Sequence, residues 1–382
     1  MGDGRVDSFD VIVIGGGIAG ASIGYELAKD RRVGLLEMEG TLAFHTTGRS
    51  AAMFLESYGG PAIRVLTTSS RAFLENPPWD ADDALLTPLA MLYVASIGRS
   101  AAIRDLHREV RELVPDVELI GPEDVVALQP LLRPGYVELA LLEPGAMEID
   151  VHALHQGFVR GMRRREGTIA VSSAIHSAQR IGDVWTLVDR SGRSWQAPLV
   201  VDAAGAWADR VARLFGARPV GLQPLRRTAF TIDAPATSQE RGRPMVDDLA
   251  AGFYVKPDRH RFLCSPADET PQEPGDARPD ELEIARALDA INQATTLDAR
   301  QVRSSWAGLR SFVSDRTPVV GFDPGVDGLF WCAAQGGYGI QTAPALARTA
   351  AALLRGQPVP DDIARRGLGA ADLAPDRPSL VD

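Results

Sequence analysis

The stretch that decides the fold is Phe9-Asp10-Val11-Ile12-Val13-Ile14-Gly15-Gly16-Gly17-Ile18-Ala19-Gly20. Phe9–Ile14 is a β-branched apolar run, typical of a buried strand in a parallel sheet. Gly15–Gly20 fits the spacing G-x-G-x-x-G, and Ile18–Lys29 carries apolar residues at helical spacing. Val33–Glu37 predicts a second buried strand. The segment therefore predicts a strand–turn–helix–strand (βαβ) unit.

The glycines of this turn suit the pyrophosphate of a dinucleotide. They permit a tight turn and let backbone N–H groups approach the anion, and the helix N-terminus adds a positive dipole end. Glu37 follows Gly17 by 20 residues, where a carboxylate accepts hydrogen bonds from a ribose diol and disfavours a 2′-phosphate. The alternative is a glycine-rich turn without a ligand. Dinucleotide binding is favoured because the strand, the helix and the acidic residue all stand at the spacing that such a site requires. The motif alone leaves FAD and NAD open.

Two further strand–turn–helix units are predicted later in the chain. One pairs the strand Leu199–Ala203 with the helix Ala206–Phe215, and the other pairs Leu329–Ala334 with Ile340–Leu354. The segments between the units are β-rich. We expect in them strands at Leu85–Ala95 and Phe253–Ser265, a hairpin at Trp185–Trp195, a surface loop at Ala267–Asp280 and a helix at Glu281–Ala290. The last dozen residues of the chain predict a loosely held tail.

Charge and composition argue against several classes of protein. The 382 residues suffice for two domains, and a net charge of −10 gives no reason to bind nucleic acid. Only two cysteines occur, Cys264 and Cys332, which excludes a disulfide framework. The histidines show no zinc pattern, so no metal is expected, and His152 and His155 are interpreted as structural or surface groups. No apolar run is long enough for a signal peptide or a transmembrane helix, and a cytoplasmic location is expected.

Two other small-residue segments could contact a cofactor. Thr47–Ala52 is polar and rich in donors, and Gly336–Gln341 joins a strand to a helix whose N–H groups could face the negatively charged side of a reduced flavin. The alternatives are a surface loop for the first and an ordinary glycine-rich turn for the second.

Two arginines in apolar surroundings are candidates for binding a carboxylate. They are Arg227 (or its neighbour Arg226) and Arg310, because a guanidinium can hold a carboxylate through two hydrogen bonds. Structural ion pairs are the competing explanation. Tyr58 and Tyr254 could add hydroxyl donors, although a tyrosine beside apolar residues is more often part of the core.

Taken together, these segments resemble the D-amino-acid oxidase/dehydrogenase superfamily, and within it most closely the bacterial D-arginine dehydrogenases. The similarity runs over nearly the whole chain. It rests on Gly15–Gly20, Thr47–Ala52, Pro122–Leu132, Ala203–Trp207 and Gly336–Gln341 in this order, and on the more specific stretches Arg71–Pro78, Ala153–Arg164, Gly221–Phe230, Phe253–Asp258, Trp306–Val313 and Ala333–Thr342.

The resemblance implies an α/β fold with a discontinuous, glutathione-reductase-type FAD-binding Rossmann domain and a mixed β-sheet substrate domain. The expected boundaries are 1–84, 142–220 and 309–382 for the first, and 85–141 and 221–308 for the second. FAD is expected to be non-covalent, since no cysteine lies near Arg310. Predicted cofactor contacts are Gly15, Gly17, Ile18, Ala19, Gly20, Glu37, Thr47, Gly48, Arg49, Ser50, Ala51, Ala52, Ala204, Gly205, Trp207, Gly336, Gly337, Tyr338, Gly339, Ile340 and Gln341.

The resemblance further implies oxidative deamination of a free D-amino acid. A hydride would pass from Cα to the flavin N5, and the imine would hydrolyse to a 2-oxo acid and ammonia. Arg227 and Arg310 would bind the carboxylate, assisted by Tyr58 and Tyr254, and Gly337 would line the pocket. The electron acceptor stays open between a quinone, another carrier and O₂.

The sequence departs from the D-arginine dehydrogenases inside the predicted pocket. Met53 replaces a histidine, Met91 replaces the glutamate that receives the substrate guanidinium, and Asp247 replaces a valine. With Met245, the thioethers favour an apolar or mid-sized uncharged substrate side chain. Alternatively Asp247 binds the cation of D-arginine or D-lysine, or points to solvent while the methionines fill core space.

Other functions remain open on the same scaffold. The arginines would equally serve a 2-hydroxy acid or a secondary amine. A flavin- or nucleotide-binding regulatory protein without catalysis is the alternative from another class, and an NAD-dependent dehydrogenase would leave Thr47–Ala52 and Gly336–Gln341 without a role.

Overall fold

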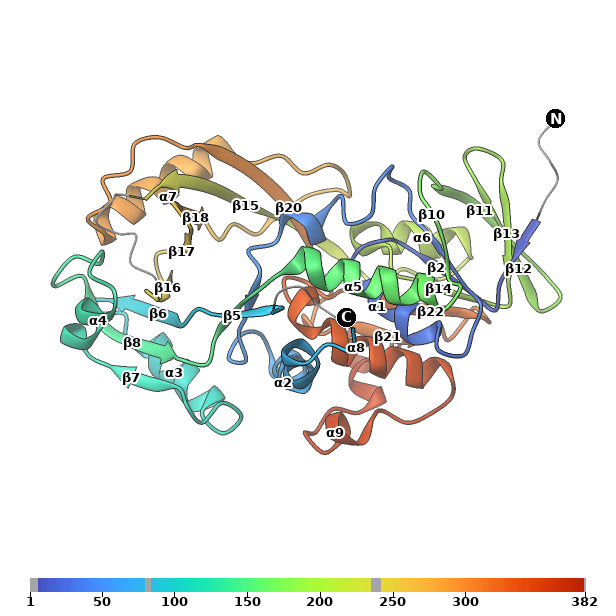
Figure 1. The fold of residues 1–382 in the computed structure, drawn as a ribbon, viewed down its shortest axis with the longest axis horizontal. Helices are drawn as coiled ribbons and strands as arrows, with labels where there is room; N and C mark the ends of the chain where they lie inside the picture. The colour runs from blue at the N-terminus through green and yellow to red at the C-terminus, as the bar shows by residue number, and fades with distance from the viewer. Residues whose placement is uncertain (1–5, 80–83, 235–241, 381–382) are drawn as a thin grey trace.

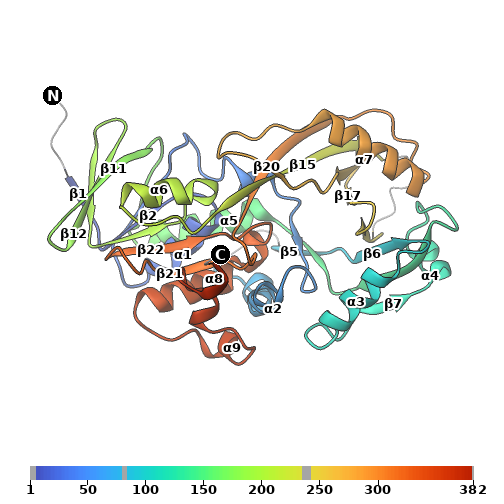
Figure 2. The ribbon, with the colours of Figure 1, turned by 180° about the vertical axis from the view of Figure 1, so that it is seen from behind.

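The structure is a computed structural model that describes residues 6–79, 84–234 and 242–380. The molecule is elongated, with a parallel sheet in one half and a mixed sheet in the other (Figure 1). The long strands β15 (Gln223–Asp233) and β20 (Ser304–Phe312) run from the mixed-sheet half toward the parallel sheet. The view from behind shows the same division (Figure 2).

A six-stranded sheet forms the core of the first half. Its order is β10-β3-β2-β14-β22-β21, and all neighbours are parallel except the last pair. The sheet takes strands from the start, middle and end of the chain, so the predicted discontinuity is confirmed. The strands are β2 Val11–Ile14, β3 Val33–Leu36, β10 Thr168–Ala170, β14 Leu199–Asp202, β21 Val319–Phe322 and β22 Leu329–Ala333.

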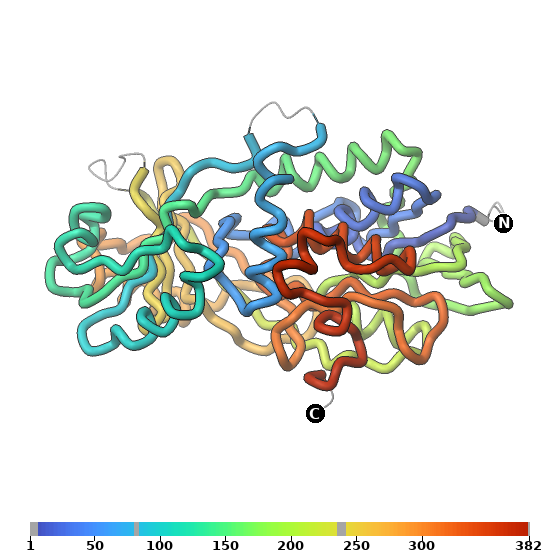
Figure 3. The backbone as a smooth tube through the Cα atoms, turned by 90° about the horizontal axis from the view of Figure 1, so that it is seen from below, coloured from blue at the N-terminus to red at the C-terminus, as the bar shows by residue number. Residues whose placement is uncertain are grey.

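Helix α1 (Ile18–Leu27) is buried because it packs against both α8 (Gly339–Leu354) and α5 (Val151–Arg164). Helix α2 (Pro61–Glu75) packs on α8, as the view from below shows (Figure 3). The predicted helices that begin at Ile18 and Ile340 are confirmed to within two residues. The one predicted at Ala206–Phe215 begins as a 3₁₀ turn, Gly205–Trp207, and continues as α6, Ala208–Leu214.

Two smaller sheets flank the parallel one. The predicted hairpin at Trp185–Trp195 is confirmed, because β12 and β13 pair antiparallel within a four-stranded sheet. Its strands are β1 Val6–Ser8, β11 Ile175–Ile181, β12 Val184–Asp189 and β13 Ser194–Ala197, and the three-stranded sheet consists of β4 Met53–Phe54, β5 Leu86–Pro88 and β9 Met147–Ile149.

A nine-stranded mixed sheet forms the core of the second half. Strand β15 pairs with β20 on one side, and the order from β15 continues through β18, β17, β16, β6, β8 and β7. The predicted domain boundaries remain a prediction. The remaining elements are β6 Met91–Ser96, β7 Glu118–Ile120, β8 Val137–Glu143, β16 Met245–Asp248, β17 Phe253–Asp258, β18 Arg261–Ser265, β19 Thr270–Pro271, α3 Ala101–Val110, α4 Pro122–Leu128, α7 Glu281–Ala294 and α9 Asp361–Ala364.

Three predicted elements of this half differ in the structure. Leu85–Ala95 is not one strand, since β5 ends at Pro88, which has no N–H to continue a ladder, and β6 joins another sheet. Phe253–Ser265 is a hairpin of β17 and β18. The loop Ala267–Asp280 contains β19 and is not wholly at the surface. The helix predicted from Glu281 is confirmed and ends one turn later than expected.

The prediction of a loosely held C-terminal tail is wrong for the residues up to Leu380. Arg377 is only 5% exposed, and its guanidinium donates to the Asp315 carboxylate at 2.7 and 2.8 Å. It also donates to the carbonyl oxygens of Pro318 and Thr317. The tail is therefore fastened to the segment after β20 by a buried ion pair.

Replacing Arg377 with alanine is expected to lower the free energy of unfolding by about 2 kcal/mol, because it leaves the Asp315 carboxylate without its main partner. Burial raises the pKa of Asp315, but hydrogen bonds from Arg377 and Ser379 outweigh it and lower the pKa to about 2. The unfolded value is about 3.9, so this stabilisation is present above pH ~4 and lost as the pH falls toward 2. Denaturant unfolding should show the two proteins converging in acid, whereas Asp376→Ala, which changes an exposed neighbour, should match wild type.

Candidate functional site

The glycine-rich turn after β2 presents backbone N–H groups at the start of α1. Gly15 has φ +110°, a conformation that favours glycine. The Thr47 hydroxyl accepts a hydrogen bond from the Ile18 N–H at 3.0 Å, and Glu37 Oε2 accepts one from the Gly16 N–H at 2.7 Å. The first N–H groups of a helix have no partner within it, so this end of α1 suits an anion.

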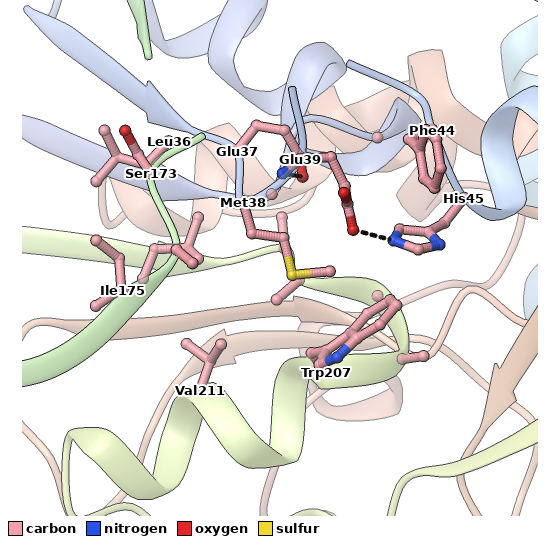
Figure 4. A pocket seen from close by; sticks show the side chains of 18 of the residues that line it. Leu36, Glu37, Met38, Glu39, Phe44, His45, Ser173, Ile175, Trp207 and Val211 are labelled. Carbon is pink, nitrogen blue, oxygen red and sulfur yellow. Dashed lines mark hydrogen bonds and ion pairs between the residues drawn. The ribbon is translucent and has the colours of Figure 1, made fainter. Parts of the chain in front are cut away.

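An outer cavity of about 680 Å³ opens at this turn. Glu37 and Glu39 lie on one side of it and Trp207 and Val211 on the other (Figure 4). The Nε2 atom of His45 lies 2.8 Å from Glu39 Oε1. The predicted cofactor residues that line this cavity are Gly15, Gly17, Glu37, Thr47, Ala204, Gly205 and Trp207.

A middle cavity of about 130 Å³ continues from the outer one, with which it shares Gly17, Thr47 and Gly205. It reaches the N-terminus of α8, and the hydroxyl of Ser311, which lines it, is buried without a hydrogen-bond partner. The predicted cofactor residues around it are Gly17, Ile18, Ala19, Thr47, Arg49, Ser50, Ala51, Gly205, Gly336, Gly337, Gly339 and Ile340.

An inner cavity of about 70 Å³ brings the predicted carboxylate-binding residues together. Arg227 lies opposite Gly308 in the β15–β20 pairing, so Arg310, two residues further along β20, is on the same face. The Arg310 Nη1 atom donates to the Tyr58 hydroxyl at 3.1 Å. Tyr254, on β17, lines both the middle and inner cavities with the two arginines.

The strand alternation decides between the two neighbouring arginines. Arg226 points to the opposite face of β15, where it pairs with Asp268 at 3.1 Å and Asp280 at 3.0 Å. Arg227 donates to the Asp268 carbonyl oxygen at 2.9 Å and to Glu269 at 3.2 Å, and it still lines the cavities.

The electrostatics of the inner cavity favour an anion. Burial, followed by the charge of Arg310, lowers the pKa of Arg227. Its usual value is so far above neutrality that it stays protonated. Two guanidinium groups that line one cavity are therefore best compensated by a carboxylate that contacts both.

The three predicted methionines lie together beside the arginines. Met53, Met91 and Met245 all line the inner cavity, and so do Asp247 and Gly337. Asp247 thus faces this cavity, with a side chain that is partly exposed. Met91 and Met245 are 1% and 3% exposed, which leaves their thioethers to the core and the cavity wall.

Gly337 is required by the position of Arg310. A Cβ added at Gly337 would lie 2.8 Å from the Arg310 Cζ atom. Gly337→Ala is therefore expected to displace the guanidinium and lower kcat/KM by about tenfold, with FAD retained, as steady-state assays and the flavin content would check. Unchanged kinetics would show that Arg310 has another productive position.

Some predicted contacts lie elsewhere. Within residues 6–79, 84–234 and 242–380, Gly20, Gly48 and Tyr338 line none of the three cavities. Gly20 and Gly48 face backbone carbonyl groups, and Tyr338 packs on Phe312. Ala52 and Gln341 line the inner cavity, not the two that the cofactor residues surround.

His155, interpreted as a structural or surface group, is structural: it is 2% exposed, and its Nε2 atom lies 3.0 Å from the Gly16 carbonyl oxygen, so it supports the glycine-rich turn. Other residues that line the outer cavity were missed by the sequence analysis. Ser173 and Ile175, near the start of β11, line the outer cavity. They come from a segment without a motif, whereas Val211 follows Trp207 by one helical turn and could have been inferred from it.

The described residues form no group of three or more His, Cys, Asp or Glu side chains that could hold a metal ion. None of the helices they form is both long and apolar enough to cross a membrane.

The outer and middle cavities fit FAD. The outer one has a carboxylate beside the glycine-rich turn, as a ribose and a pyrophosphate require, with an aromatic wall at Trp207. The middle one combines small side chains, the unpartnered Ser311 hydroxyl and the α8 N-terminus, which suit a flat polar ring. Cys264 and Cys332 line neither cavity.

Comparisons with known proteins agree with this assignment. A family model described as "FAD dependent oxidoreductase" (DAO) matches residues 10–353. FAD-dependent oxidoreductase domain-containing protein 1 of Xenopus laevis is 24% identical over 92% of this chain and 80% of its own length. Glycine oxidase of Geobacillus kaustophilus is 24% identical over 88% of this chain and 90% of its own.

Solved structures share the fold. The crystal structure of glycine oxidase from Geobacillus kaustophilus has a TM-score of 0.82 at 21% identity, over 96% of this chain and 99% of that one. L-proline dehydrogenase from P. horikoshii has a TM-score of 0.79 at 18% identity, over 92% and 95% of the two chains. The predicted fold class is thereby confirmed, whereas the finer resemblance to D-arginine dehydrogenases stays a prediction.

Proposed function

Because the chain belongs to the DAO family of FAD-dependent oxidoreductases, we propose that it oxidises the Cα–N bond of a free D-amino acid with an apolar or mid-sized side chain. The products are a 2-imino acid, which water hydrolyses to a 2-oxo acid, and ammonia. The observation that carries the proposal is that Arg227 and Arg310 share one face of the β15–β20 pair and both line the middle and inner cavities.

The arginines bind and orient the substrate in this proposal. Their guanidinium groups hold the α-carboxylate, and the Tyr58 hydroxyl, already bonded to Arg310, fixes one of them. When bound, FAD supplies the acceptor for the hydride that leaves Cα. If the arginines hold the carboxylate between the middle and inner cavities, Cα faces the middle cavity, where the flavin ring fits, and the side chain extends into the inner cavity. This is the alignment that hydride transfer from Cα requires.

The methionines support the choice of side chain. Met53, Met91 and Met245 offer flexible thioethers that adapt to apolar groups and exclude water from the reacting carbon. The glutamate expected from D-arginine dehydrogenases is absent, because Met91 occupies that position. The D configuration rests on the family resemblance alone. The names of the relatives do not support either configuration consistently, because glycine is achiral and L-proline dehydrogenase is named for an L-amino acid.

Two further properties belong to the proposal. FAD is held without a covalent bond, which is supported by the burial of Cys264 and Cys332 away from the cavities. Acid precipitation of the protein would then release all the flavin into solution. The protein is expected to act in the cytoplasm and to pass electrons to a quinone, another carrier or O₂.

The test is an anaerobic titration of the purified protein with D- and L-amino acids, following the oxidised flavin band. Bleaching by D-leucine, D-methionine or D-phenylalanine, and not by their L forms, is expected. Bleaching mainly by D-arginine or D-lysine would contradict the uncharged side chain. A flavin that only N-methyl amino acids or 2-hydroxy acids bleach would replace the proposal with those substrates, and one that nothing bleaches would overturn catalysis.

A further inference from the structure

We infer that Asp247 forms a second recognition point in the inner cavity, which binds an N–H or O–H donor at the end of the substrate side chain. The inference rests on the proposed function and narrows it. The substrate would have an apolar stem against the methionines and a hydrogen-bonding tip, as in a side-chain amide, an imidazole or an indole.

Asp247 differs from the neighbouring acids because it has no hydrogen-bond or ion-pair partner among the described residues. Asp248 accepts hydrogen bonds from Tyr136 at 2.8 Å and from the N–H groups of Ala250 and Ala251. In the described part of the chain, the Asp247 carboxylate forms no hydrogen bond and no ion pair within 4.0 Å, although it faces a cavity lined by two arginines. The Asp247 side chain is partly exposed to this cavity, and a ligand that fills the cavity would take the carboxylate out of water, so its natural complement is a donor on that ligand.

Glu143 cannot take this role, although it lies opposite Met91 in the sheet. It is 1% exposed and accepts hydrogen bonds from the Glu56 N–H at 2.8 Å and from the Ser57 hydroxyl. Its capacity is used within the protein, and it lines none of the three cavities in the described residues. Asp247 is therefore the free acceptor in this wall.

The position of Asp247 favours the substrate side chain over the α-amine. Arg227, Arg310 and Tyr254 line both the middle and the inner cavity, whereas Asp247 lines only the inner one, together with the methionines. Cα and its amine must face the middle cavity, where FAD fits. Asp247 lies beyond the arginines, on the side to which the substrate side chain extends.

The sheet order gives the scale of this separation. Two strands, β18 and β17, lie between β15, which carries Arg227, and β16, which carries Asp247. Three steps of ~4.8 Å place the two backbones about 14 Å apart. The arginine side chain spans part of this distance, and a substrate side chain of a few bonds would span the rest. Glycine would leave Asp247 unpartnered.

The groups around Asp247 set the pH at which it acts. Burial raises its pKa to about 7, Arg227 and Arg310 lower it, and Asp248 raises it. Tyr254 and Tyr93 face it from the paired strands on either side. The carboxylate is therefore ionised above pH ~7, where it accepts most strongly, and preference for a donor should grow as the pH rises from 6 to 8.

The experiment compares substrates of nearly equal shape that differ in a terminal donor: D-asparagine with D-leucine, and D-glutamine with D-methionine. Wild type should favour the amide of each pair by about 10- to 100-fold in kcat/KM. Asp247→Val should remove that preference, and Asp247→Asn, which keeps a neutral acceptor, should reduce it and abolish its pH dependence; in both variants kcat/KM should fall more for D-asparagine and D-glutamine than for D-leucine and D-methionine. Asp258→Asn removes the same charge from the exposed end of β17 and should leave the preference intact.

Three outcomes would overturn the inference. A preference for the amide substrates that persists in both variants shows that Asp247 does not bind the end of the substrate side chain. An equal loss on all substrates shows that it holds the α-amine. A wild type that favours D-leucine and D-methionine shows that the tip of the substrate side chain is apolar.

Failure of the proposed function would give a different result, because no amino acid would then reduce the flavin of the wild-type protein. Flavin content and melting temperature identify a variant that has not folded, and the other variant then decides.

Discussion

Arg310→Met is expected to lower kcat/KM for the best amino acid on the order of 10²- to 10³-fold, with FAD still bound. The partly buried guanidinium lines the inner cavity, where it donates to Tyr58 and lies against Gly337. Methionine keeps much of the volume but removes the charge and every donor, so the substrate carboxylate would be desolvated beside Arg227 alone. Removing one partner of a buried, hydrogen-bonded charge pair typically costs 2–5 kcal/mol, which corresponds to this range.

The measurement is steady-state kinetics with the flavin content of each preparation determined. Arg310→Lys keeps the charge without the two-pronged geometry and should fall between wild type and methionine. Arg303→Met removes a charge just before the same strand, where the side chain is exposed and pairs with Asp233, and should behave as wild type. A methionine variant that retains its kcat/KM would show that the carboxylate binds elsewhere.

The first half of the fold could be predicted because its signals are local. In Val11–Gly20 the strand, the glycine spacing and the helix follow one another without a gap, so a short stretch specifies a βαβ unit. The two later units repeat the pattern. Which strands are neighbours in the sheet is not local information, and the family resemblance implied only that the three units belong to one discontinuous domain.

The mixed sheet was harder because its pairings join distant segments. An apolar run such as Leu85–Ala95 has the composition of one strand, and only Pro88 marks the break. The tail was misjudged for the same reason, since Arg377 is fastened by Asp315, 62 residues earlier. Ion pairs of this kind leave no pattern within a local window.

The candidate site shows the same division. Arg226 and Arg227 are adjacent in sequence, and only the register of β15 against β20 shows which one faces the cavities. Asp247 and Asp248 are equally ambiguous in sequence, yet Asp248 accepts three hydrogen bonds whereas Asp247 accepts none from the residues that the structure describes. The sequence shows which residue types are present. The face of the sheet on which each side chain lies is set by the register of its strand, and the register depends on partner strands elsewhere in the chain.

Gly20→Ala is expected to abolish most FAD binding and to destabilise the protein, although Gly20 lines no cavity in the described residues. An added Cβ would lie 1.8 Å from the Gly15 carbonyl oxygen, which is backbone and cannot rotate away. Helix α1 must therefore move off β2 and carry the anion-binding N–H groups with it. The packing strain costs roughly 1–3 kcal/mol or more, and each lost charge-assisted hydrogen bond lowers FAD affinity by about 10-fold or more.

Fluorescence titration of the apoprotein with FAD and thermal unfolding without it separate these two effects. Gly121→Ala is the control for the same change at a helix N-terminus, because Gly121 directly precedes α4, has φ −87° and has no atom within 4 Å of an added Cβ. It should bind FAD as wild type does. Normal FAD binding by Gly20→Ala would contradict this prediction. It would show that the pyrophosphate does not depend on the close contact between α1 and the turn after β2, and hence that the first strand–turn–helix unit does not have the role assigned to it.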